Sequence, residues 1–285
     1  GFAIEYVGAV PVFVDSDEQS WCLDVEQVRE KLTEGEQKGC PIAAVMAVDL
    51  FGRTPNYQEL EAIVEDFGVL LIEDAAEALG STFDSKSAGS FGLLRAVSFN
   101  GNKIVSAAGG GAVLTDSKEL ASHVRSLATQ ARRNVHWFEH EEVGFNYRMS
   151  NLQAAVGSAQ LGRLDDLVEH RRHVKSLYDK FLNHSDSGIS VVPDSAPCRS
   201  NAWLTTLLLP DNVQARGIVE SLHVRGIEAR MNWKPMHLQP VFGHYGNSGL
   251  TVSERLFAHG ICCPSGRGLS DSDVEEVAVT ILDLV

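Results

Sequence analysis

An aspartate and a lysine follow two apolar segments of this sequence, and together they could do chemistry. Asp74 ends the apolar run at residues 69–72, and Lys103 follows the apolar run at residues 93–99. Apolar runs of this length that end in turn residues predict buried strands. In open α/β sheets, ligands bind at the carboxyl ends of the strands. We therefore expect the Asp74 and Lys103 side chains to meet in one crevice.

A carboxylate and an amine in one crevice match the needs of pyridoxal phosphate. Its aldehyde requires an amine for a Schiff base, which Lys103 offers, and its ring nitrogen requires a carboxylate, which Asp74 offers. Ser98 is a candidate donor to the phosphate, and the glycines at 109–111 allow close approach of the backbone. Taken singly, these residues have simpler explanations, with Lys103 as a surface lysine and Asp74 as a helix N-cap. The glycine run is not G-x-G-x-x-G, so a dinucleotide site has little support.

Composition and charge exclude several classes of protein. The chain has 285 residues, of which 44% are hydrophobic, and this predicts one large core or two domains. A formal net charge of -14 argues against a nucleic-acid partner or an anionic membrane surface. No apolar run approaches the roughly 20 residues that a membrane-spanning helix needs. The five cysteines form no Cys-x-x-Cys pair, which predicts a reducing, cytoplasmic setting without zinc or disulfides.

Strands alternate with helices through the first half of the chain. We expect a strand at residues 10–14, a fully buried strand at 41–52, a helix at 57–68 closed by Gly68, a further buried strand within 69–80 that ends at Glu73-Asp74, and an antiparallel return at 110–117. Strands that are hydrophobic almost throughout and alternate with helices predict an α/β fold around a mainly parallel sheet.

The second half is mostly helical at first and then mixed. Residues 151–182 carry Leu and Val at helical spacing, with a bend or break expected near Gly162. A strand at 202–210, a helix at 213–226, a strand at 227–233 and a closing helix at 270–285 follow, the last with Ser270 and Asp273 in the roles of a capping box. We therefore predict a large cofactor-binding domain at residues 1–165 and a smaller domain at residues 166–285.

Ten motifs in order along the chain resemble those of one enzyme family. They are "GAVPVFVD", "DLFG", "IEDAAEALGS", "GSFG", "SFNGNKI", "GGGAVLT", "EVGFNYRMSNLQAAVGSAQL", "RSNAWLTTLL", "WKPMHLQPVF" and "CCPSG". The chain thereby resembles the DegT/StrS sugar aminotransferases, which are fold-type-I pyridoxal phosphate enzymes. The resemblance implies a mainly parallel central sheet sandwiched by helices and a smaller C-terminal α+β domain. The "SFNGNK", "RSNAWLTT" and "WKPMHLQ" versions look most like the UDP-4-amino-sugar enzymes of the bacillosamine and legionaminic acid pathways.

The resemblance implies roles for five residues that bind the cofactor. Lys103 matches the Schiff-base lysine, Asp74 the partner of the pyridine nitrogen and Ser98 a phosphate ligand. Glu77 occupies a position often held by Gln, which implies a role beside the cofactor's ring oxygen. Asn146 matches an asparagine that reaches the phosphate in the neighbouring subunit, so a homodimer with a shared active site is expected.

The substrate follows from the same resemblance. The expected reaction moves an amino group from glutamate to the 4-keto group of a UDP-linked 6-deoxy-N-acetyl sugar. GDP- or dTDP-linked sugars are alternatives, and so is a truncated relative without catalysis. A nucleotide sugar brings a diphosphate, so cations and aromatic rings are candidates for its site: Arg148, Trp203, Lys234 and His237, with Arg230 and Trp233 behind them. His136 and His140 are too few for a metal site, so no metal is expected.

The sequence departs from the family pattern in two places. Relatives begin with a helical segment and a "SGT"-like turn that cradles the cofactor phosphate, and we expect that this N-terminal segment is absent from the sequence given. Asp49 stands in "DLFG" where many relatives have His.

Residues 132–142, rich in His and aromatic side chains, are expected to form a mobile loop at the active site.

Overall fold

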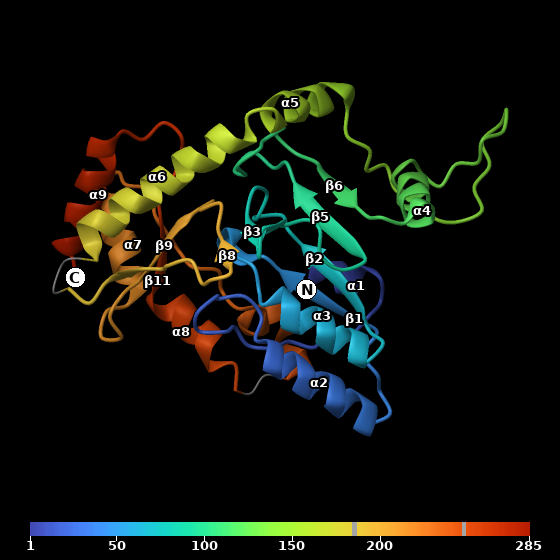
Figure 1. Ribbon diagram of the computed structural model, residues 1–285, viewed down its shortest axis with the longest axis horizontal. Coiled ribbons are helices and arrows are strands. Elements are labelled where there is room, and N and C mark those ends of the chain that lie inside the picture. The colour runs from blue at the N-terminus through green and yellow to red at the C-terminus, as the bar shows by residue number, and fades with distance from the viewer. Residues whose placement is uncertain (184–186, 247–248) are drawn as a thin grey trace.

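The first sheet of the molecule is mainly parallel, as the sequence predicts. The computed structural model describes residues 1–183, 187–246 and 249–285 (Figure 1). Its first sheet has the order β1-β2-β5-β6. Strands β1 (Ala44–Val48), β2 (Leu70–Asp74) and β5 (Leu94–Ser98) are parallel, and β6 (Gly111–Leu114) returns antiparallel to β5.

Two helices cover one face of this sheet. Helices α2 (Val25–Gln37) and α3 (Tyr57–Asp66) begin at the side-chain caps Asp24 and Asn56 and pack through Leu32, Leu60 and Ile63 onto Val45 and Leu71. Strand β1 was expected to be buried on both faces, and this is wrong: its residues alternate, with Val48 at the exposed end. Only the face toward α2 and α3 is closely covered by the described residues.

The N-terminal segment differs from the expectation in one place. Helix α1 (Phe2–Tyr6) ends before Gly8, which has a φ of +75°. Residues 10–14 form no strand, although β-branched residues predicted one. Val10 and Val12 are exposed, and the neighbouring pairing is a single bridge between Ser16 and Leu23. Strand propensity is realised only where a neighbouring strand and a packed face are available.

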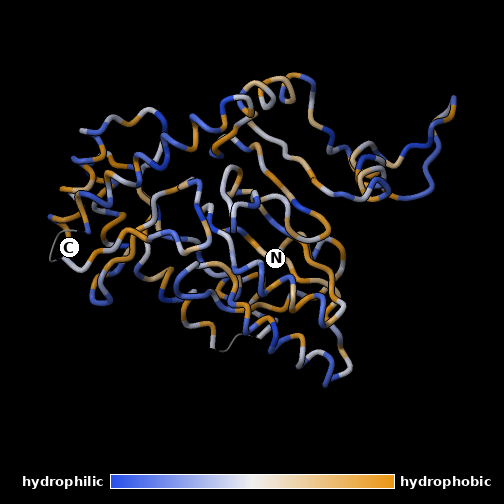
Figure 2. The backbone as a smooth tube through the Cα atoms, viewed as in Figure 1, coloured by the Kyte–Doolittle hydropathy of each residue, from blue (hydrophilic) through white to orange (hydrophobic). Residues whose placement is uncertain are grey.

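An arm extends from the body of the molecule between the first sheet and the second. It comprises α4 (Lys118–Ala128), residues 129–150 and α5 (Asn151–Leu161) (Figure 1). A capping box of Ser150 and Gln153 starts α5. The chain then bends at Gly162 into α6 (Leu164–Leu182), which confirms the predicted break. Apolar and polar residues are interspersed along the arm (Figure 2).

The second sheet is antiparallel and small. Its order is β10-β11-β9-β7, formed by Arg230–Met231, Gly260–Cys263, Thr205–Leu208 and Ser190–Val191. Helices α6, α7 (Ala215–Val224) and α9 (Asp271–Leu282) share a core with it, and α8 (Thr251–His259) leads into β11. All four strands follow residue 165, where we predict the domain boundary.

Short elements join the two halves. A three-stranded sheet pairs β3 (Thr82–Phe83) with β4 (Lys86–Ser87) and with β8 (Cys198–Arg199). The turns η1 (Leu50–Gly52), η2 (Met236–Leu238) and η3 (Pro240–Tyr245) complete the described elements. A mixed core that includes Phe51, Ile104 and Trp203 also lies between the halves. Among the helices in the described part of the chain, none combines the length and apolarity that crossing a bilayer requires.

Candidate active site

The carboxyl ends of two neighbouring parallel strands, β2 and β5, bring Asp74 and Ser98 to the same edge of the first sheet. Asp74 ends β2 opposite Ala96 of β5, and Ser98 ends β5. The Asp74 carbonyl accepts the Asp49 backbone N–H at 3.0 Å, and its Oδ1 accepts the Ala76 N–H at 3.1 Å. These bonds hold Asp74 at the carboxyl ends of the parallel strands, where open α/β sheets bind their ligands.

Lys103 lies in the turn after β5, between a carboxylate and an aromatic ring. Its Nζ is 3.3 Å from Glu77 Oε1 and 3.8 Å from the centroid of the Trp203 ring. The Trp203 indole N–H donates to the Asn102 carbonyl at 2.7 Å, which fixes the ring against the lysine's own turn. An ammonium over an indole face is attracted by the ring's electrons. The lysine that the sequence singled out is therefore a positioned, mostly buried group.

Glu77 is held in place by a strained turn. Its Oε2 accepts the Phe51 backbone N–H at 2.8 Å, and Phe51 has a φ of +55°, in the left-handed region. Burial raises the pKa of Glu77, and the positive charge of Lys103 opposes that rise. Glu77 thus supplies Lys103 with a carboxylate in a site largely shielded from water.

Asn201 ties the second half of the chain to this site. Its amide donates to the Glu77 carbonyl at 2.9 Å and to the Leu79 carbonyl at 3.0 Å, and its Oδ1 accepts the Trp203 N–H at 2.9 Å. A Cβ at Gly52 would lie 1.9 Å from Asn201 Oδ1, so the "DLFG" glycine leaves room for this amide. The sequence-based predictions did not include this role of Asn201. The amide two residues before Trp203 in "RSNAW" was the signal that could have identified it.

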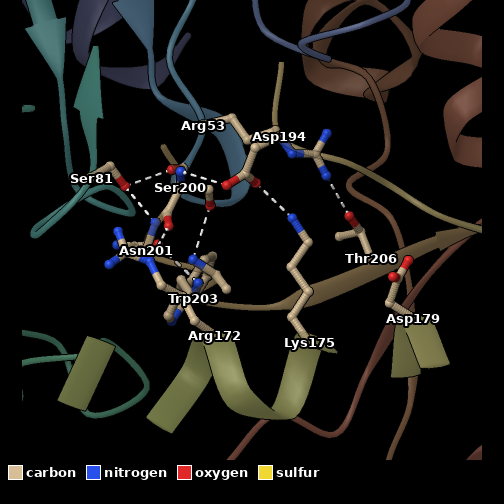
Figure 3. A network of polar contacts seen from close by, with 12 residues as sticks. Arg53, Ser81, Arg172, Lys175, Asp179, Asp194, Ser200, Asn201, Trp203 and Thr206 are labelled. Atoms are coloured by element: carbon tan, nitrogen blue, oxygen red, sulfur yellow. Dashed lines mark hydrogen bonds and ion pairs between the residues drawn. The ribbon is translucent and has the colours of Figure 1, made fainter. Parts of the chain in front are cut away.

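Helix α6 supports the same segment from the other side. Figure 3 shows Arg172 donating to the Ser200 carbonyl, at 2.9 Å, and Lys175 paired with Asp194, at 2.6 Å. Asp194 in turn accepts the Ser200 N–H at 3.2 Å. The turn that carries Asn201 and Trp203 is therefore fixed by polar contacts with several elements.

Two buried acids lie behind the site. Glu73 accepts the backbone N–H groups of Gly89 and Phe91 at 2.6 and 2.7 Å, and Asp49 accepts the Tyr57 hydroxyl at 2.7 Å. Burial, and then the nearby charge of Glu73, raises the pKa of Asp49 well above its ordinary value. A protonated Asp49 is a donor to Glu73. The sequence-based predictions did not include Glu73. Its position as an acid within an apolar strand was the signal that could have identified it as a buried, hydrogen-bonded group.

The remaining predicted residues lie farther along the chain. Lys234 is exposed next to Trp233, whose ring is 5.3 Å from Phe51 and 6.3 Å from Trp203. His237 is buried, with Nε2 3.0 Å from Glu254 Oε1. The structure brings Lys103, Glu77 and Trp203 into contact, and it places Lys234 at the edge of the adjoining aromatic group.

Asn146 and Arg148 lie elsewhere, on the exposed arm. Asn146 forms a bridge with Thr129 at the end of α4, and Arg148 is exposed just before α5. The segment expected to be a mobile loop is also part of the arm, where Arg133 pairs with Glu139 at 2.9 Å. Helix α4 and the segment that follows it project away from the two sheets (Figure 1).

The side chains near Lys103 fit pyridoxal phosphate. An amine, a carboxylate at a strand end and a serine hydroxyl at the neighbouring strand end are the donor set that its aldehyde, ring nitrogen and phosphate require. The described residues contain no group of three His, Cys, Asp or Glu side chains arranged to hold a metal ion.

Comparisons with known proteins place the whole chain beside aminotransferases. Residues 2–282 match the DegT/DnrJ/EryC1/StrS aminotransferase family. The chain is 40% identical over 286 residues to a putative pyridoxal phosphate-dependent aminotransferase, EpsN, of Bacillus subtilis, covering 99% of this chain and 73% of that protein. It is 32% identical to the GDP-perosamine synthase of Caulobacter vibrioides, covering 99% and 75%. A DegT DnrJ EryC1 StrS aminotransferase from Brucella abortus superposes with a TM-score of 0.90 at 31% identity, covering 99% and 75%.

Proposed function

The chain belongs to the DegT/DnrJ/EryC1/StrS aminotransferase family, and we propose that it aminates the 4-keto group of a nucleotide-linked 6-deoxy sugar, with glutamate as the amino donor. Its relatives are nucleotide-sugar aminotransferases, and its cofactor is pyridoxal phosphate. The contact of Lys103 with Glu77 and Trp203, beside the strand-end Asp74, carries this proposal.

Each residue has a role that its position supports. When bound, pyridoxal phosphate supplies an aldehyde for the amino group and a ring that accepts electrons. Lys103 Nζ anchors the aldehyde carbon and later takes and returns a proton at the reacting carbon, because one amine close to both positions serves both tasks. Asp74 keeps the ring nitrogen protonated, Ser98 donates to the phosphate, and Glu77 holds the Lys103 ammonium.

The nucleotide is proposed from resemblance. A UDP-linked N-acetyl sugar is the first candidate, on the "SFNGNK", "RSNAWLTT" and "WKPMHLQ" motifs. A GDP-linked sugar is the second, because GDP-perosamine synthases of Caulobacter vibrioides and Vibrio cholerae are each 32% identical to this chain. Arg148, Lys234 and His237 are the proposed contacts to the sugar and diphosphate. The ring of Trp203 lies against Lys103, so its proposed contact with the substrate is beside that lysine.

A homodimer with shared active sites is part of the proposal. Helix α4 buries none of its residues within the chain. The rest of the arm exposes large apolar side chains: Trp137, Phe138, Val143, Phe145, Tyr147, Leu152 and Val156. Exposed apolar surface of this extent is typical of an interface. In the proposed dimer, a second copy packs on this surface and Asn146 reaches the cofactor phosphate of the partner subunit.

The cytoplasm is the proposed compartment. All five cysteines are free thiols, four of them buried, which suits a reducing environment.

A panel of nucleotide sugars tests the proposed substrate. The purified enzyme, supplied with pyridoxal phosphate and glutamate, is assayed against UDP-, GDP- and dTDP-linked 4-keto-6-deoxy sugars by mass spectrometry of the amino-sugar product. A kcat/KM highest for the UDP-linked N-acetyl sugar supports the first candidate. A preference for the GDP-linked sugar selects the second, and turnover of none of the three contradicts the proposal.

A further inference from the structure

A separate cavity adjoins Lys103 on the side of α6. It has a volume of about 260 Å³ and is lined by the turn after β5, the junction of α5 and α6, and the loop after β11. The lining residues are Lys103, Ile104, Ser106, Gln160, Arg163, Leu167, His170, Arg171 and Arg267. Asp74, Glu77 and Ser98 are not among them, so only Lys103 belongs to both this cavity and the candidate active site.

The charge of the cavity is opposite to that of the protein. The chain carries a formal net charge of -14, whereas the described lining includes three arginines, Lys103 and a histidine, and no carboxylate. Within the described ranges, no acidic side chain forms an ion pair with Arg163, Arg171 or Arg267. Lys103 is paired with Glu77, whereas the three arginines have no carboxylate partner in the described part of the chain, and this local excess of cations favours an anionic ligand.

Arg171 is the innermost of these cations. Its Nη1 donates to the carbonyl oxygens of Trp203, at 3.1 Å, and of Ser265. Both acceptors are neutral, and burial lowers the pKa of Arg171. A partly buried guanidinium without a carboxylate is costly, and its fork of N–H groups retains donors beyond the two that Nη1 uses.

Two further polar groups lie in the same wall. His170 Nε2 is buried and has no hydrogen-bond partner in the described part of the chain. Gln160 Oε1 already accepts the Ser106 N–H at 3.0 Å, so the polar group that remains on Gln160 is its donor amide. A buried polar atom without a partner requires an explanation, and a ligand that accepts hydrogen bonds supplies one.

We propose that this cavity binds a doubly charged oxyanion, of phosphate or dicarboxylate chemistry, at a site distinct from that of the cofactor phosphate. Arginine forks match the oxygen pairs of both groups. The site also communicates with the reaction centre, because Arg171 holds the carbonyl of Trp203 and the Trp203 ring faces Lys103. An anion on Arg171 therefore acts on the reaction centre through Trp203, in a cavity whose wall includes Lys103 itself.

Calorimetric titration of the cofactor-saturated enzyme tests the proposal. Inorganic phosphate, 2-oxoglutarate and UDP are titrated separately at fixed ionic strength, and we expect saturable binding of at least one, with one site per chain. Arg163 and Arg267 are exposed, so the double variant Arg163→Gln/Arg267→Gln should fold normally and bind roughly tenfold or more weakly. The matched control Arg216→Gln removes an exposed arginine of α7, outside the cavity, and should bind as the wild type does.

Three outcomes would overturn the proposal. They are the absence of saturable binding of all three probes, an equal loss in Arg216→Gln, and binding that occurs only in cofactor-free enzyme, which would assign the anion to the cofactor phosphate site. The identity of the probe that binds separates phosphate from dicarboxylate chemistry. Because the measurement requires no turnover, it stands or falls independently of the proposed aminotransferase reaction.

Discussion

The Lys103 ammonium and the Glu77 carboxylate lie 3.3 Å apart, with side chains only 13% and 14% exposed. Glu77 is oriented in turn by the Phe51 N–H, from a residue in the left-handed region. A pair this sheltered interacts more strongly than a surface ion pair. The amine is therefore held by a carboxylate that the "DLFG" turn itself positions.

The Trp203 ring is expected to contribute to activity as well as to the buried core. Trp203→Phe keeps a ring face but loses the hydrogen bond to Asn102 and part of the attraction to Lys103. These losses are worth about 1–2 kcal/mol, so we expect kcat to fall roughly five- to thirtyfold. Trp21→Phe, which truncates another buried indole that faces a cation, Arg53, is the matched control. Equal kcat values for wild type and Trp203→Phe would contradict the role assigned to the indole.

Gly52 is expected to be intolerant of any side chain. Gly52→Ala places a Cβ 1.9 Å from Asn201 Oδ1, in addition to the strain of a φ of +82°. Gly68→Ala is the matched control, because its φ is +65° and no atom lies within 4 Å of the added Cβ. We expect about 1 kcal/mol of destabilisation for Gly68→Ala and clearly more for Gly52→Ala, measured by urea unfolding. Equal losses would show that Asn201 is not packed against Gly52.

The buried acid pair predicts a pH dependence of stability. The pKa of Asp49 is raised in the folded state, so stability is fully present below the ordinary Asp range and is lost as pH rises toward the raised value. Asp49→Asn keeps a donor for Glu73 and an acceptor for Tyr57 but cannot ionise. We expect this variant to lose less stability than the wild type in urea unfolding as the pH rises above the ordinary Asp range.

Two controls define that experiment. Asp66→Asn, at the exposed end of α3, should retain the wild-type pH dependence. Asp49→Ala should be destabilised by about 1–3 kcal/mol, because it leaves buried polar groups without partners. Identical pH dependences of Asp49→Asn and the wild type would mean that Asp49 is ionised in the folded protein.

Shared active sites predict complementation between two inactive variants. Lys103→Ala and Asn146→Ala homodimers should each be impaired. After mixing and subunit exchange, a heterodimer has one site with both residues intact, so roughly a quarter of wild-type activity should return. Mixing Lys103→Ala with the double variant Lys103→Ala/Asn146→Ala is the control and should restore none. If the first mixture also restores none, Asn146 does not serve the partner's site.

Local patterns predicted most of the elements that carry the site. The buried runs before Asp74 and Lys103 became β2 and β5, and the parallel pairing of these strands agrees with the mainly parallel sheet that the alternation of strands and helices predicted. The bend at Gly162 and the capping box of Ser270 and Asp273 also followed from local signals, which depend on residues only a few positions apart.

Contacts between distant segments were not predictable in this way. Asn201 reaches Glu77 and Trp203 reaches Lys103 across a hundred residues or more, and no periodicity encodes such pairs. The expected strand at residues 10–14 failed for a related reason, because the partner that a strand needs is a tertiary property.

Covalent trapping of the cofactor tests the central claim most directly. The enzyme is loaded with pyridoxal phosphate, reduced with borohydride, digested and mapped by mass spectrometry. The account predicts a pyridoxyl-phosphate adduct on Lys103, and loss of the adduct and of the visible absorption band in Lys103→Ala. A folded enzyme that carries its label on another lysine, or that acquires none, would contradict it.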